Sequence, residues 1–96
     1  MNTLDKDAVS AMVCEALNCE KNIWEKSRKA DVCLARQIVW WLFWKSGYGH
    51  SEMAKIFEWN RVTMLHGTNL IQSYVERYHD FSKLCMGLNE RLHQAA

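Results

Sequence analysis

The sequence predicts an all-α fold, a single small helical domain that takes up the whole chain of 96 residues. The chain contains no proline and only four glycines, so the residues that most disfavour helix interiors are absent or rare. Hydrophobic residues make up 49% of the chain and charged residues 24%, which is typical of a globular domain. Apolar residues also recur at the spacing of an amphipathic helix in several long segments, enough for one modest core.

The first predicted helix covers Leu4–Leu17, where apolar side chains follow helical spacing. Asp5 and Asp7 fall in its first turn, where negative charge favours the helix dipole. Asn18 is a residue type that ends helices. The mostly polar segment Cys19–Lys29 is predicted to be a connector, with room for one helical turn.

A long helix is predicted from about Asp31, a suitable N-cap, to Lys45, with Gly47 at a C-cap-like position. A short helix follows, with Ser51 as its cap and its end near Phe57. The inward stripe of the long helix is predicted to be Ala35, Ile38, Val39 and Leu42.

The next helix is predicted to start near Asn60 or Arg61, after a turn at residues 58–60, and to run towards Tyr78. Gly67 in its middle costs roughly 1 kcal/mol relative to alanine, so we expect close helix packing there as compensation. Asp80 is predicted to cap the final helix, whose apolar spacing is set by Phe81, Leu84, Cys85, Leu88 and Leu92.

The short helix, the tight turn and the next helix together predict a helix-turn-helix, which places the start of its second helix in the DNA major groove. At that start, Arg61 is a candidate to contact guanine, or else a surface arginine paired with Glu58. Asn60 is a candidate to contact adenine, or else an N-cap. Val62 is a candidate to touch a thymine methyl, or else a core residue.

The charge distribution is more informative than the net charge of +1. The first 20 residues hold one basic and four acidic side chains, whereas residues 21–45 hold six basic and two acidic ones. This basic segment comes just before the helix-turn-helix. It is either a phosphate-contacting surface or a solvated helix face.

The other unusual feature of the sequence is a group of three tryptophans in one predicted helix, Trp40, Trp41 and Trp44. One hypothesis is that Trp44, together with Trp40, is exposed and contacts a second copy or another protein. The alternative for Trp40, Trp41 and Trp44 is a thick core that the N- and C-terminal helices also cover.

Catalytic and metal sites are not predicted. The four cysteines form no CxxC pair and no spacing with histidine that suits zinc, so we expect reduced, partly buried thiols in a cytosolic protein, with no cofactor. His66 is expected to be a packed or hydrogen-bonded side chain. No leader segment is expected, and the longest apolar run, residues 38–44, is too short to cross a membrane.

Three segments resemble a known family when they are taken together. Ser27–Ile38, SRKADVCLARQI, resembles the basic run and A-R-Q-I/V helix start of the C-terminal DNA-binding domain of the bacterial replication initiator DnaA. MAKIF at residues 53–57 is similar to the E-I-G-x-x-F segment of its first helix-turn-helix helix. NRVTMLHG at residues 60–67 is similar to the D-H-[ST]-T-V-L-H-A signature of its recognition helix.

The resemblance implies a free-standing domain over residues 1–96, with a Trp-repressor-like helix-turn-helix and a motif core at about 27–78. It implies binding to double-stranded DNA in the nucleoid, for replication control or transcriptional regulation of a mobile element. Base contacts are implied for Asn60, Arg61 and Val62. Contacts to the DNA backbone are implied for Lys26, Arg28, Lys29, Arg36, Thr63 and His66.

The chain departs from the family pattern at Ala30, where the family has a basic residue for the minor groove, and at Val62, where it has threonine or serine. The net charge of +1 is also low for a DNA-binding protein. A second hypothesis is therefore a protein-interaction module that has lost DNA binding and uses the Trp40, Trp41 and Trp44 helix.

Overall fold

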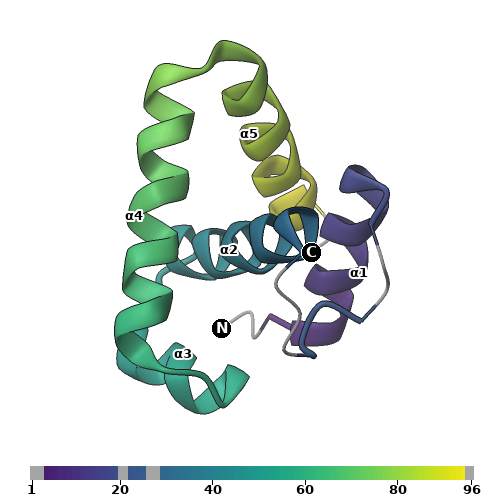
Figure 1. Ribbon diagram of the computed structural model, residues 1–96. Helices are drawn as coiled ribbons and strands as arrows, with labels where there is room; N and C mark the ends of the chain where they lie inside the picture. The colour runs from purple at the N-terminus through teal and green to yellow at the C-terminus, as the bar shows by residue number, and fades with distance from the viewer. Residues whose placement is uncertain (1–3, 20–21, 26–28, 95–96) are drawn as a thin grey trace.

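A computed structural model describes residues 4–19, 22–25 and 29–94. This part of the chain contains five α-helices and no strand, which confirms the predicted all-helical fold (Figure 1). The helices are α1 (Lys6–Leu17), α2 (Ala30–Lys45), α3 (His50–Phe57), α4 (Arg61–Arg77) and α5 (His79–Gln94).

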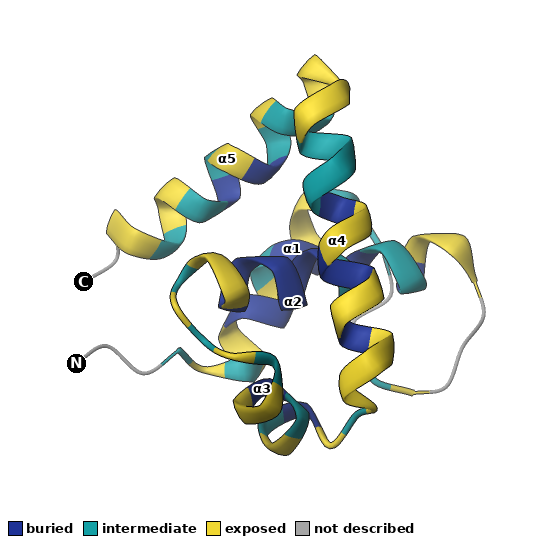
Figure 2. Ribbon diagram, turned by 90° about the vertical axis from the view of Figure 1, so that its left-hand side faces the viewer, coloured by how far each residue is buried: buried dark blue, intermediate teal, exposed yellow. Residues whose placement is uncertain are grey.

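The centre of the molecule is α2, which contacts each of the other four helices. In Figure 1 it crosses behind the long, upright α4, while α1 lies beyond its other end and α5 turns back from the top of α4. A helix that is apolar on all sides must be covered on all sides, and the run Ile38–Phe43 is buried without interruption (Figure 2).

The tryptophans of α2 are therefore mostly part of the core. Trp41 is fully buried and Trp40 is 2% exposed, so the hypothesis that Trp40 lies on the surface is wrong. Trp44, 38% exposed, is the one of the three that reaches the surface, as expected. Trp40 and Trp41 therefore belong to the core, as the alternative holds, and α1 and α5 do contact α2. Trp40 packs against Gly67 on α4, Trp59 in the turn and Trp24 in the connector.

Most helix ends lie within two residues of the predicted positions. Asp5 is the N-cap of α1, and Asn18 ends that helix in the left-handed conformation. Two caps differ, because α2 and α3 begin earlier than expected: Lys29 caps α2 and Gly49 caps α3. Asp31 and Ser51 accordingly lie inside the first turns of their helices.

The junction between the last two helices also differs from the prediction. Tyr78 has an extended backbone and ends α4, and α5 starts directly at His79. Asp80 therefore lies in the first turn of α5, where its negative charge still favours the helix dipole.

Gly67 gives α4 its close approach to α2, as predicted. A β-carbon at this position would lie 3.0 Å from Gln37 Cγ and 3.0 Å from Trp40 Cε3. Met64 and Ile71, one turn before and after Gly67, are fully buried on the same side. These three residues fix which side of α4 faces the core, and so which side faces solvent.

Candidate nucleic-acid interface

The turn between α3 and α4 is short and well bonded. Glu58 adopts the left-handed conformation, with φ of 52°, and its N–H donates to Ala54 O. Trp59 N–H donates to the same carbonyl at 3.3 Å. The Trp59 ring lies 5.8 Å from Trp40 and 6.2 Å from Trp24, so the turn is anchored to aromatic side chains of the core.

Asn60 is the N-cap of α4, as one of its two predicted roles requires. Its Oδ1 accepts hydrogen bonds from the N–H groups of Val62 at 2.9 Å and Thr63 at 3.1 Å. These bonds satisfy two of the N–H groups that a helix start leaves without partners. The adenine contact stays a prediction, for which the side-chain NH₂ is the remaining donor.

Substitution at Asn60 separates the capping role from base recognition. Asn60→Ala should lower the free energy of unfolding by about 1 kcal/mol, because the cap is lost. Asn60→Ser should keep most of the stability, since serine also caps, but it removes the amide that adenine recognition needs. Urea denaturation of both variants is the measurement. Equal stability losses for alanine and serine would contradict the capping role.

The first two turns of α4 face solvent. Between Arg61 and His66 only Met64 is buried. Val62 is 53% exposed, which excludes the core alternative for this side chain. His66 is also exposed, so the expectation of a packed histidine is wrong: the 3.6-residue period carries it to the side opposite Gly67 and Thr68.

A different histidine, His50, makes a partly buried contact. The Nε2 atom of His50, at the start of α3, lies 3.2 Å from Thr68 Oγ1, and that hydroxyl donates to Met64 O at 2.8 Å. This pair links the two helices of the helix-turn-helix. No sequence pattern indicates this pair, because Thr68 and His50 are 18 residues apart and neither follows a motif.

The predicted backbone-contacting residues fall into three groups. Thr63 and Lys29 are exposed, Thr63 on α4 and Lys29 at the N-cap of α2. Lys26 and Arg28 lie outside the described residues. Arg36 is buried and does not lie on a phosphate-contacting surface.

Arg36 instead joins two parts of the structure. Its Nε donates to Ile23 O at 2.6 Å and its Nη2 to Glu25 O at 3.3 Å, and its guanidinium lies 5.0 Å from the centre of the Trp59 ring. It is 7% exposed. The prediction of a phosphate contact for Arg36 is therefore corrected: its charge is used to hold the connector and the turn before α4.

The surface of the helix-turn-helix is mixed in character. Over residues 50–66 its exposed basic side chains are Lys55 and Arg61, and its exposed acidic ones are Glu52 and Glu58. Within the described part of the chain, no ion pair joins Arg61 to Glu58. Val62, Leu65 and Leu70 add exposed apolar surface along the same helix. The surface is thus neither continuously basic nor continuously acidic.

The described residues show neither a metal-binding cluster nor a membrane-spanning helix. No group of three or more histidine, cysteine or acidic side chains is placed to hold a metal ion within the described ranges. No helix among those residues is long and apolar enough to cross a membrane.

No protein-family model and no curated protein sequence matches the chain.

Proposed function

We propose that this protein binds double-stranded DNA and that the first two turns of α4 enter the major groove. The observation that carries the proposal is the solvent-facing start of α4, which follows an eight-residue helix and a short, anchored turn. An α-helix with its side chains is about 10–12 Å across, and the major groove of B-DNA is about 12 Å wide. The size and exposure of this segment therefore suit insertion into the groove.

The exposed side chains supply the chemistry that groove recognition needs. Arg61 offers paired donors to guanine, the Val62 methyl groups suit a thymine methyl, and the Asn60 NH₂ is a donor for adenine. Thr63 and His66 are donors for phosphate oxygens on either side of the groove. The positive end of the α4 dipole favours the same polyanion.

The finer assignment rests on the resemblance to the DnaA domain. It supports a role in replication control or transcriptional regulation in the bacterial nucleoid. Lys26, Arg28 and Lys29 are the basic residues that we assign to the DNA backbone. Arg36 no longer belongs to that set, so fewer phosphate contacts are expected than the resemblance alone implies.

The proposal predicts different effects for Arg61 and Lys29. Arg61→Ala should cost about 1–3 kcal/mol on the preferred DNA sequence and little on random DNA, because a base contact is lost. Lys29→Ala should weaken binding to all sequences alike and reduce the slope of log affinity against log salt by about one unit. Fluorescence anisotropy of labelled duplexes, one with a DnaA-box-type site and one random, measures both effects across a salt titration.

Arg77 provides the matched control. It is an exposed arginine at the far end of the same helix, 16 residues from Arg61 and so about 24 Å away along the axis. Arg77→Ala should leave affinity and salt slope unchanged. Equal losses on both duplexes for Arg61→Ala would remove its role in base recognition, and no binding to either duplex at low salt would refute the proposal.

A second candidate function, favoured by the exposed apolar side chains, is protein binding. Val62, Leu65 and Leu70 lie on α4, and Trp44 reaches the surface from α2. Of the predicted Trp40, Trp41 and Trp44 surface, only Trp44 is available for such a contact. Sedimentation equilibrium tests the homodimer: a monomer mass that is independent of concentration would exclude it.

A further inference from the structure

Two cysteines meet at the C-terminal end of α1. Cys19 N–H donates to Cys14 O at 3.1 Å, and Asn18 N–H donates to Glu15 O at 3.3 Å. With Asn18 in the left-handed conformation, this pair of bonds is a Schellman motif. Cys14 and Cys19 occupy the two positions of that motif whose side chains pack together.

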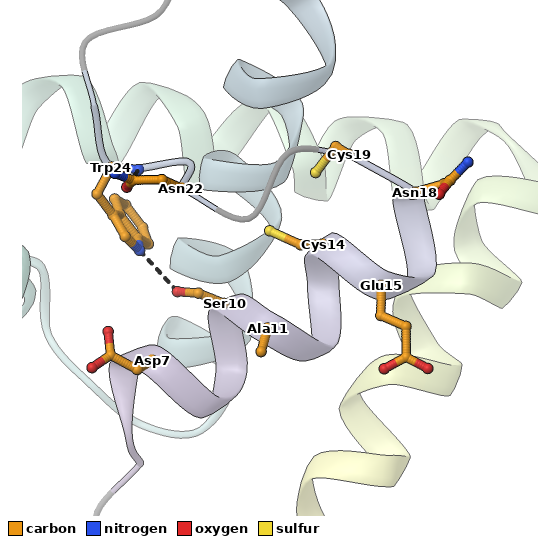
Figure 3. Close-up of a pocket in the computed structure, with 9 residues that line it drawn as sticks. All are labelled: Asp7, Ser10, Ala11, Cys14, Glu15, Asn18, Cys19, Asn22 and Trp24. Carbon is orange, nitrogen blue, oxygen red and sulfur yellow. Dashed lines mark hydrogen bonds between the residues drawn. The ribbon is translucent and has the colours of Figure 1, made fainter.

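The two thiols are in contact and differ in access. The two side chains are neighbours, and both sulfur atoms lie on the same side of the end of α1 (Figure 3). Cys14 is 5% exposed, whereas Cys19 is only half-buried. Both line a pocket of about 720 Å³ whose other lining residues come from α1 and its C-cap and from Asn22 and Trp24. A small molecule in this pocket would therefore reach Cys19 first.

We propose that Cys14 and Cys19 form a redox modification site, in which the two thiols are oxidised to a reversible intramolecular disulfide by exchange with a small-molecule disulfide. Native disulfides join residues whose Cα atoms are about 4.4–6.8 Å apart, and the Schellman hydrogen bond holds the two backbone segments close together. The bond closes only the short segment 14–19 at the end of α1.

The order of the two steps follows from access. The Cys19 thiolate attacks one sulfur of the small disulfide, forms a mixed disulfide and releases one thiolate. The Cys14 thiolate then attacks Cys19 Sγ and releases the second thiolate. Two protein thiols are oxidised, one disulfide is reduced to two thiols, and the two protons pass to the released thiolates.

The environment of Cys14 fits the role of second nucleophile. Burial, and to a lesser degree the neighbouring Cys19 thiol, raises the pKa of Cys14 to about 11. Cys14 is thus protonated at neutral pH and does not attack an external disulfide directly. It reacts once the mixed disulfide on Cys19 lies beside it.

The other two cysteines are internal controls. Burial raises the pKa of Cys85 to about 12, and its side chain is fully buried. Cys33 lies on α2 and takes no part in the Schellman motif that ends α1.

The chain offers a direct test. Cystamine is a suitable probe, because its cationic amines match the carboxylates of Asp7 and Glu15 at the pocket. Trypsin cuts after Lys6 and Lys21, so one peptide, residues 7–21, holds both cysteines, while Cys33 and Cys85 fall in separate peptides.

The protein is equilibrated with cystamine and cysteamine, alkylated, digested without reductant and analysed by mass spectrometry. We expect peptide 7–21 to lose two hydrogen atoms and to carry no alkyl group, and dithiothreitol to restore both alkylation sites. Two alkylated thiols, or a stable cysteamine adduct without an internal bond, would overturn the proposal.

Two single substitutions test the order of attack. Cys14→Ser should trap a cysteamine adduct on Cys19, whereas Cys19→Ser should leave Cys14 free of adduct over the same time. Adduct formation on Cys14 at an equal rate would overturn the assigned order. Circular dichroism of both variants checks that the helical fold is kept.

Discussion

Replacing Trp41 with alanine is expected to lower the free energy of unfolding by about 3–5 kcal/mol, the usual loss when a buried tryptophan is truncated. Trp41 is fully buried on α2, and its Nε1 donates to Gln72 Oε1 on α4 at 2.9 Å. The substitution therefore removes packing between the central helix and the candidate recognition helix. It also leaves a half-buried amide oxygen without its donor.

Urea denaturation followed by circular dichroism measures this loss. Trp44→Ala is the control on the same helix, since Trp44 is 38% exposed, and it should change stability much less. If Trp41→Ala unfolds the domain outright, Trp41→Phe gives a smaller loss of about 1–3 kcal/mol that is still measurable. Equal losses for Trp41→Ala and Trp44→Ala would contradict the position of Trp41 in the core.

Replacing Arg36 with alanine is expected to cost about 2–4 kcal/mol of stability. Two backbone carbonyls lose a charged hydrogen-bond donor, and Trp59 loses the cation that lies over its ring. Arg36→Lys should recover little, because a lysine ammonium cannot reproduce the guanidinium's simultaneous contacts with both carbonyls and the ring.

Arg61→Ala is the matched arginine control for stability. Arg61 is exposed, so its replacement should change the free energy of unfolding by no more than about 0.5 kcal/mol. Thermal or urea denaturation of the two variants compares them. An Arg36→Ala protein with wild-type stability and weaker DNA binding would restore the phosphate contact that the sequence predicts.

The two substitutions show how the fold supports the proposed interface. Arg36 ties the segment before α2 to Trp59 in the turn, and Trp41 ties α2 to Gln72 on α4. Together with the close contact at Gly67, they fix the start of α4 in the orientation that exposes Arg61 and Val62. Neither Arg36 nor Trp41 needs to touch DNA to affect binding.

The features that the sequence predicted well depend on local chemistry. Asn60 caps α4 because its short amide reaches two nearby N–H groups, and Asn18 ends α1 because asparagine tolerates the left-handed conformation. Gly67 marks a close helix contact because a glycine inside a helix costs stability that packing must offset. Such signals span only a few residues, so one sequence is sufficient to show them.

The mistaken predictions concern residues whose surroundings come from distant segments. Periodicity cannot show which side of α2 is exposed when nearly every side of residues 38–44 is apolar. Trp40 lies inside because Gly67, Trp59 and Trp24, all distant in the sequence, pack against it. A basic residue beside other basic residues looks like a phosphate contact until its neighbours are known, as Arg36 shows.

The sequence by itself thus determined the all-helical fold, the helix-turn-helix spacing, the Asn60 cap and the helix end at Asn18, because these features depend on residues within one or two turns. Only the tertiary structure decided that Arg36 and Trp40 are buried, that His66 and Val62 face solvent, and that Cys14 and Cys19 share a pocket. The physical reason is that burial is set by which helices pack together, and those contacts join residues far apart in the chain.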